Sequence, residues 1–119
     1  MAPLRIGFVG AGRMGNHHAN KLSGLADRAV ITAIDDVDTE KTNQLASRTD
    51  ARPYIDYRVM LKREPLDAVF ILTPPTVCLL PVQIACEKKI AVFCEKPPSL
   101  SCNETLQIAD EIDRARIRI

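Results

Sequence analysis

A glycine-rich turn near the start of this sequence has the residue types and spacing of a phosphate-binding site. It has the pattern G-x-G-x-x-G and consists of Gly10, Ala11, Gly12, Arg13, Met14 and Gly15. The turn follows an apolar run, Leu4–Val9, and precedes a stretch of helical period, which is the context that binding of a dinucleotide pyrophosphate requires. Gly10 would permit a tight turn, Gly12 a close approach to the phosphates, and Gly15 close packing of helix on strand. Free N–H groups and the positive end of the helix dipole would bind the phosphates.

Two acidic residues follow the second apolar run. Asp35 and Asp36 lie about 20 residues beyond the last glycine, where a carboxylate accepts hydrogen bonds from the adenosine ribose hydroxyls. A carboxylate there repels the 2′-phosphate of NADP, so the sequence favours NAD as the cofactor. We expect Asp36 rather than Asp35 to bind the ribose, because Asp35 can still belong to the strand. The alternative is that both only begin a turn before a helix that Asp38 caps.

A particular order of elements must position these residues. Apolar runs of strand length alternate with stretches of helical period, which is typical of βαβ units and of a mostly parallel sheet with helices on both faces. The sequence therefore predicts a doubly wound α/β fold. The expected strands are Leu4–Val9, Ala29–Ile34, Arg52–Ile55, Leu66–Leu72 and Ile90–Cys94. The expected helices are Arg13–Ser23, Thr39–Thr49, Asp56–Arg63, Val77–Lys88 and one from the Ser101 cap to about Arg114.

Local signals refine the expected helix ends. Gly24 is expected to stop the first helix, and Pro81 is tolerable in the fourth only within its first turn. Ser101 and Glu104 form a capping box at the start of the last helix. The segment Ala115–Ile119 begins like another strand, which predicts that the natural polypeptide continues.

Composition narrows the class of protein. The chain has 119 residues, 46% of them hydrophobic, and its 16 basic and 15 acidic side chains leave a net charge of +1, which is typical of one soluble domain and argues against a nucleic-acid partner. No apolar run approaches the roughly 20 residues that span a membrane. No export signal is visible, so we expect a cytoplasmic protein.

Several residues that often carry chemistry have a structural interpretation here. Cys78, Cys86, Cys94 and Cys102 form no C-x-x-C pair, so we expect buried hydrophobic residues rather than a metal site or disulfides. His17 and His18 are adjacent on a helix and do not share a face, which favours a structural role for both. The three phenylalanines, Phe8, Phe70 and Phe93, lie in strand runs and are expected in the core.

Two later motifs, Thr73-Pro74 and Glu95-Lys96-Pro97, carry a family resemblance. Together with the glycine turn and Asp36-Val37-Asp38, they resemble the N-terminal domain of the Gfo/Idh/MocA family, which contains glucose–fructose oxidoreductase, inositol 2-dehydrogenase and related sugar dehydrogenases. The resemblance covers essentially the whole chain. It implies that residues 1–119 are a Rossmann domain that binds NAD or NADP. In complete members a second α/β domain binds the sugar or polyol substrate and builds a homo-oligomer.

The resemblance also implies roles for the later motifs. Lys96 would assist proton transfer near the nicotinamide, Glu95 would orient that lysine, and Pro97 would shape the turn. Thr73 and Pro74 would line the nicotinamide pocket. The carboxyl ends of the strands are where open α/β sheets bind ligands, and a lysine beside a positively charged nicotinamide would have a lowered pKa. The alternative for Glu95 and Lys96 is a solvated surface ion pair.

The sequence departs from the family pattern at three points. Cys78 stands where members often carry His, which puts in doubt any contact assigned to that position. Lys89 stands where members usually have Gly, so we predict a left-handed Lys89 or a locally reshaped turn. The Asp and His that complete proton abstraction belong to the second domain, so a chain that ends at Ile119 should bind a dinucleotide and catalyse little or nothing.

Two other functions stay open at this point. Some proteins of this fold are non-catalytic regulators that sense a dinucleotide, and Cys78 together with the early stop at Ile119 keeps that alternative open. A domain that binds S-adenosylmethionine shares the glycine turn and the acidic residue, but it does not account for Glu95-Lys96-Pro97. Lys96 favours the enzyme, an oxidoreductase that transfers hydride between a nicotinamide cofactor and a secondary alcohol of a sugar or polyol.

Overall fold

Parallel strands form the centre of the molecule. The computed structural model describes residues 2–74, 77–95 and 101–116, and within them five strands form one sheet in the order β3-β2-β1-β4-β5. All four neighbouring pairs are parallel. The strands are β1 Leu4–Val9, β2 Ala29–Asp35, β3 Arg52–Tyr54, β4 Ala68–Ile71 and β5 Ala91–Cys94. The helices are α1 Arg13–Ser23, α2 Thr39–Thr49, α3 Tyr57–Arg63, α4 Leu79–Glu87 and α5 Cys102–Ala115.

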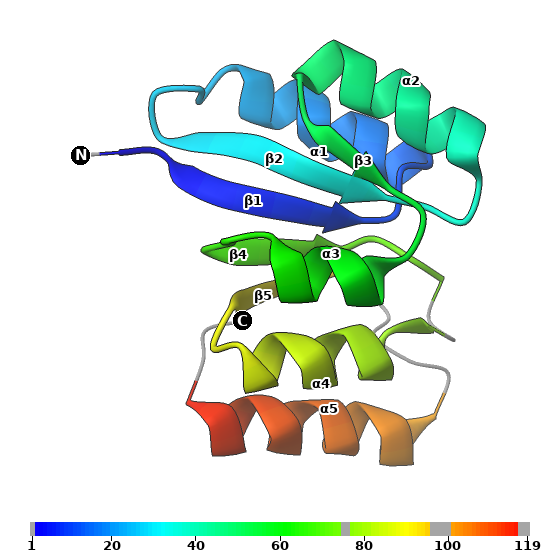
Figure 1. Cartoon of the computed structure of the whole chain (residues 1–119). Coiled ribbons are helices and arrows are strands. Elements are labelled where there is room, and N and C mark those ends of the chain that lie inside the picture. The colour runs from blue at the N-terminus through cyan, green and yellow to red at the C-terminus, as the bar shows by residue number, and fades with distance from the viewer. Residues whose placement is uncertain (1, 75–76, 96–100, 117–119) are drawn as a thin grey trace.

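The helices lie in layers on the two faces of this sheet (Figure 1). One hydrophobic cluster, which includes Phe8, Ile34 and Leu45, lies between the sheet and the pair α1 and α2. A second, which includes Ile71 and Val82, lies between the sheet and the pair α3 and α4, and α5 packs on α4. Strands, helices and layers alternate as predicted, so the doubly wound Rossmann fold is confirmed.

Side-chain caps explain where three of the helices begin. Asp38 accepts hydrogen bonds from the backbone N–H groups of Glu40 and Lys41, at 3.1 and 3.3 Å. Asp56 accepts from the N–H of Arg58 at 2.9 Å. Ser101 accepts from the N–H of Glu104 at 3.1 Å, which is the first half of the predicted capping box. Each cap supplies a partner to an N–H that the helix itself cannot satisfy.

The ends of several elements differ from the prediction. β4 and β5 are shorter than expected, and α4 begins at Leu79, which places Pro81 in its first turn as required. The strand expected from Ala115 does not begin there, because Ala115 still belongs to α5 and Arg116 ends the helix with φ +58°. Residues 117–119 of that expected strand lie outside the described residues.

Two helix-ending residues behave differently from each other. Lys89 has φ +58°, so the predicted left-handed conformation is confirmed, and its Nζ donates a hydrogen bond of 2.6 Å to the carbonyl of Ala115. Gly24 does follow the last residue of α1, but it is right-handed, with φ −79°. Its N–H donates to the carbonyl of Lys21, so a tightened last turn ends this helix without a left-handed residue.

The expected core residues are only partly buried. Phe8 is fully buried, but Phe93 is 40% exposed, so its prediction as a core residue was wrong. The reason is its position on β5, the last strand of the described sheet. Cys78 and Cys86 are buried free thiols, as predicted, and Cys94 is half-buried with its Sγ 2.7 Å from that of Cys78.

Candidate functional site

A cleft lies at the carboxyl ends of the strands, where the strand order reverses. Both β2 and β4 pair with β1, so the connections from β1 and β4 leave the sheet in opposite directions. Such a switch point is where open α/β sheets bind ligands. The cleft measures about 440 Å³ and is lined by Gly10, Gly12, Asp35, Asp36, Val37, Lys41, Tyr57, Leu72, Thr73, Pro74 and Val77. Its size suits a small-molecule or cofactor site.

The three glycines of the turn meet different surroundings. Gly10 has φ +113°, which side chains rarely allow, and its N–H donates to the carbonyl of Asp35 at 2.8 Å. A Cβ added at Gly15 would lie 2.9 Å from the carbonyl oxygen of Gly10, so the fold itself excludes a larger residue there. A Cβ at Gly12 would meet no described atom within 4 Å. The backbone at Gly12 is therefore open to a ligand, as a bound pyrophosphate requires.

The helix that follows the turn can bind an anion. Gly12 is the N-cap of α1, and no side-chain cap and no acidic residue in the first turn are found among the described residues. The first N–H groups of a helix have no carbonyl partner within the helix, and the helix dipole makes this end positive. Arg13 is exposed there, Met14 is half-buried, and Ala11 is buried before them. This arrangement fits the phosphates of a dinucleotide.

The carboxylate of Asp36 lies between the turn and α2. One oxygen accepts a hydrogen bond of 2.8 Å from the N–H of Ala11, and the other accepts one of 2.9 Å from the N–H of Asp38. Each carboxylate oxygen has a second lone pair, so Asp36 can still accept from ribose hydroxyls. The half-buried side chain lines the cleft.

Asp35 has a different environment from its neighbour. It is the last residue of β2 and only 3% exposed. Burial raises the pKa of its carboxyl to about 7, with smaller contributions from the charges of Asp36 and Asp56. Asp35 does belong to the strand, as the preference for Asp36 assumed.

The later motifs approach the same edge of the sheet. The hydroxyl of Thr73 donates to the carbonyl of Val77 at 2.9 Å, and the carbonyl of Pro74 accepts from the N–H of Val77 at 2.9 Å. The N–H of Glu95 donates to the carbonyl of Ile71 at 3.1 Å, which places Glu95 at the end of β4 and β5. Lys96 and Pro97 lie outside the described residues.

Some residues at this edge were missed by the sequence analysis. Val37, Lys41 and Tyr57 line the cleft, and His18 contacts Glu95. Val37 was noted only as the middle residue of the motif Asp36-Val37-Asp38, and no local pattern marks Lys41 or Tyr57, because each lies in an ordinary helix start. His18 and Glu95 are 77 residues apart in the chain, and only the fold, in which the ring of His18 contacts Phe93 of β5, brings them together.

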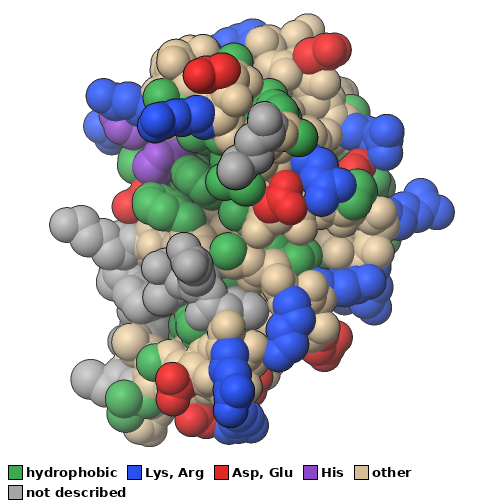
Figure 2. All heavy atoms as spheres, turned by 90° about the vertical axis from the view of Figure 1, so that its left-hand side faces the viewer, with side chains coloured by type: hydrophobic (Ala, Val, Ile, Leu, Met, Phe, Trp, Pro, Cys, Tyr) green, Lys and Arg blue, Asp and Glu red, His purple; other side chains and the backbone are tan. Residues whose placement is uncertain are grey.

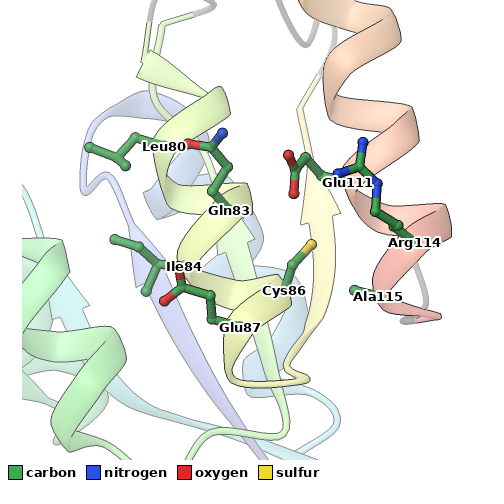
Figure 3. A pocket seen from close by; sticks show the side chains of 8 residues that line it. All are labelled: Leu80, Gln83, Ile84, Cys86, Glu87, Glu111, Arg114 and Ala115. Atoms are coloured by element: carbon green, nitrogen blue, oxygen red, sulfur yellow. The ribbon is translucent and has the colours of Figure 1, made fainter.

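A second hollow is larger but lacks this chemistry. It measures about 500 Å³ and lies between α4 and α5, where Figure 3 shows side chains from both helices around it. None of the residues predicted for the cofactor lines it. In the described part of the chain no three His, Cys, Asp or Glu side chains are grouped to hold a metal ion. Of the helices described, none is long and apolar enough to cross a membrane.

The comparison with protein families shows which cofactor this fold binds. Residues 4–118 match the model of an oxidoreductase family described as an NAD-binding Rossmann fold. The chain belongs to the Gfo/Idh/MocA family of oxidoreductases. As a Gfo/Idh/MocA domain it binds NAD, and the fold and family that the motifs indicated are confirmed. The family match removes the S-adenosylmethionine alternative.

Relatives of this Gfo/Idh/MocA domain are longer proteins. It is 37% identical over 101 residues to the uncharacterized oxidoreductase YrbE of Bacillus subtilis, covering 83% of this chain and 29% of that protein. It is 32% identical over 116 residues to the myo-inositol 2-dehydrogenase of Thermotoga maritima, covering 96% of this chain and 34% of that enzyme. The chain thus spans about a third of the length of these relatives.

Solved structures agree with this assignment. The WlbA dehydrogenase of Chromobacterium violaceum, in complex with NADH and UDP-GlcNAcA, superposes with a TM-score of 0.94 at 27% identity over 98% of this chain and 34% of its own. The myo-inositol 2-dehydrogenase of Lactobacillus plantarum has a TM-score of 0.90 at 29% identity, over 98% of this chain and 35% of its own. The Gfo/Idh/MocA domain described here has the fold of the matched third of each of these chains.

Proposed function

We propose that this chain is the cofactor-binding part of an NAD-dependent dehydrogenase that acts on a secondary alcohol of a sugar or polyol. The observation that carries the proposal is the cleft at the carboxyl edge, where Gly12, Asp36 and Thr73 come together from three separate segments. The names of the relatives, which include inositol dehydrogenases, support a polyol as the substrate class. Those relatives are about three times as long as this chain, which leaves room for the second domain that would bind it.

The cleft residues would hold the cofactor along its length. The N–H groups from Gly12 to Gly15 would bind the pyrophosphate, with Arg13 beside it and Ala11 and Met14 shaping the turn. Asp36 would accept hydrogen bonds from the adenosine ribose, with Asp35 buried behind it. Asp36 would repel a 2′-phosphate, which supports NAD over NADP.

The proposed chemistry is an oxidation at one carbon. The bound nicotinamide supplies the acceptor for a hydride from the carbinol carbon, and the hydroxyl proton leaves as the ketone forms. Lys96 would assist the transfer of that proton, and Glu95 and Pro97 would position it. Thr73 and Pro74 would line the nicotinamide pocket. Glu95, the residue before Lys96, lies at the same edge of the sheet as the cleft, which supports this assignment.

The proposal extends to the complete protein. We expect a cytoplasmic homo-oligomer whose partners are small molecules, and the balanced charge of the chain supports the expected absence of a nucleic-acid partner. The competing function, a non-catalytic sensor of the dinucleotide, would share the cleft but would not need Lys96.

A substitution of Lys96 in the complete protein tests the proposal. Lys96→Met should reduce turnover of polyol substrates by at least about a hundredfold, the lower range for a general acid or base, while the Kd for NADH stays within about twofold. Lys88→Met, at an exposed lysine that ends α4, is the matched control and should leave both unchanged. Unchanged turnover in Lys96→Met would remove the catalytic assignment. NADH binding without turnover of any polyol by the unmodified protein would favour the sensor.

A further inference from the structure

A side-chain contact joins α1 to the end of β5. The Nε2 atom of His18 lies 3.0 Å from the Oε2 atom of Glu95, and the two side chains are 18% and 26% exposed. An ionised carboxylate can only accept hydrogen bonds, so opposite an ionised Glu95 the Nε2 of His18 would carry the hydrogen and donate it. The contact is partly shielded from water, so it constrains both side chains more than an exposed pair does.

Aromatic rings set the orientation of His18. Its ring meets Phe70 and Phe93 edge-on, with centroids 5.6 and 5.1 Å apart, within the range of favourable aromatic pairs. Phe70 and Phe93 are themselves stacked at 4.6 Å, and Phe8 stacks on Phe70 at 5.4 Å. These three are direct register partners across β1, β4 and β5. Figure 2 shows the two histidines side by side, next to hydrophobic side chains.

The stacked rings of Phe8, Phe70 and Phe93 restrict the position of the His18 ring relative to Glu95. Because neighbouring strands are hydrogen-bonded in register, Phe8, Phe70 and Phe93 cannot move independently. Phe93 is 40% exposed, and the ring of His18 packs against it. His18 therefore holds one place relative to β5, and its Nε2–H is directed at the carboxylate.

Two contacts with other described residues hold Glu95. Its backbone N–H donates to the carbonyl of Ile71 on β4, and its side chain accepts from His18 on α1. The backbone bond sets where the residue lies, and the side-chain bond restricts its rotamer. The chain continues from Glu95 directly into Lys96.

We propose that His18 is a positioning residue, which orients Lys96 through Glu95. The proposal rests on the proposed function, because it takes Lys96 as the residue that assists proton transfer. α1 begins at the glycine turn that would bind the pyrophosphate, so the contact couples that helix to the segment that carries Lys96. A displacement of about 1 Å at a reacting group can cost a hundredfold in rate, so a contact that limits such displacement affects turnover more than cofactor binding.

Substitutions at two adjacent histidines in the complete protein test this role. His18→Phe keeps an aromatic ring against Phe70 and Phe93 but removes the N–H donor. His18→Gln loses the ring but places an amide N–H near the position of Nε2. We expect His18→Phe to lower kcat about tenfold with the Kd for NADH within about twofold, and His18→Gln to recover most of the loss. His17→Phe, at the exposed neighbour, is the control and should leave kcat unchanged.

A double variant tests whether the effect of His18 on kcat depends on Glu95. If His18 acts through Glu95, His18→Phe should lower kcat much less in a Glu95→Gln background than in the unmodified protein. Equal losses in both backgrounds, no loss in His18→Phe, or a loss that His18→Gln does not recover would each overturn the proposal. Thermal unfolding of each variant shows whether a loss reflects instability, which would also count against positioning.

Measurements on the unmodified protein distinguish a failure of the proposed function from a failure of the role of His18. If it neither binds NADH nor oxidises any polyol, the proposed function fails, and the role of His18 fails with it. If it is active and His18→Phe is equally active, only the role of His18 is overturned.

Discussion

The carboxylate of Asp36 accepts a hydrogen bond of 2.8 Å from the backbone N–H of Ala11. The acidic residue after β2 thereby holds the glycine turn after β1, and the second oxygen holds the N–H of Asp38. Asp36 consequently stabilises the protein's own loops through these two hydrogen bonds. Its remaining lone pairs face the cleft and can accept hydrogen bonds from a ligand. A substitution there should change both loop order and cofactor selection.

The selection of NAD by Asp36 is the first prediction. Asp36→Asn should weaken NAD binding by about tenfold to a hundredfold, because a hydrogen bond to a charged group contributes about 1.5–3 kcal/mol. The preference for NAD over NADP should also fall, because the repelling charge is gone while Lys41 still lines the cleft. Titration of the complete protein with both dinucleotides measures the ratio. Asp27→Asn, at an exposed turn, is the control, and an unchanged ratio in Asp36→Asn would contradict the prediction.

The same substitution at two glycines of the turn should affect different properties, NADH binding at Gly12 and stability at Gly15. Gly12→Ala should leave the free energy of unfolding within about 1 kcal/mol, since no described atom lies near its added Cβ, but it should abolish NADH binding. Gly15→Ala should lower the free energy of unfolding by about 1–3 kcal/mol, because its Cβ would lie 2.9 Å from the carbonyl oxygen of Gly10. Denaturant unfolding and NADH fluorescence separate the two effects. If Gly12→Ala is destabilised and still binds NADH, the glycine turn is not the segment that binds the pyrophosphate.

The carboxyl of Asp35 predicts a pH dependence of stability. Its pKa is raised to about 7 in the folded chain, and an unfolded aspartate titrates near 3.9. Between these values the folded state binds more protons than the unfolded state. The free energy of unfolding should therefore fall as the pH rises from about 4 to about 7, by up to about 1.4 kcal/mol per pH unit, and level off above pH 7.

An isosteric variant isolates this contribution. Asp35→Asn cannot ionise, so its stability should decline less over the same pH range, whereas Asp27→Asn should follow the unmodified protein. Denaturant unfolding at several pH values provides the comparison. Parallel pH profiles for Asp35→Asn and the unmodified protein would show that Asp35 does not titrate in this window.

The left-handed Lys89 predicts a stabilising substitution. Lys89→Gly should raise the free energy of unfolding by about 0.5 kcal/mol, because Gly avoids a left-handed penalty of about 1 kcal/mol while losing the hydrogen bond from Nζ to Ala115. Lys88→Gly is the matched control. Lys88 is right-handed, with φ −89°, so Gly there should lower stability. Equal effects at both positions would mean that backbone conformation does not decide the outcome.

Much of the fold was predictable because its signals are local. Apolar runs and helical periods placed all five strands and all five helices of the described chain, and Asp38 and Ser101 marked where helices begin. The left-handed Lys89 was predicted from the family resemblance, because Lys89 stands where members usually have Gly, the residue that adopts this conformation without strain. The ends of strands were less predictable, since β4 and β5 stop where pairing with a neighbour stops. Phe93 was misplaced because its exposure depends on what lies beside β5.

The candidate site also has features that the sequence predicts and features that only the tertiary structure shows. The sequence alone determined the glycine turn, the acid after β2 and the family, because each depends on residue types in fixed order along the chain. Only the tertiary structure decided that Ala11 binds Asp36, that Lys41 and Tyr57 share the cleft, and that His18 contacts Glu95. Such contacts join residues on different elements, and their geometry depends on how the whole sheet twists and packs. Residue order carries the chemistry of each group, whereas packing decides which groups meet.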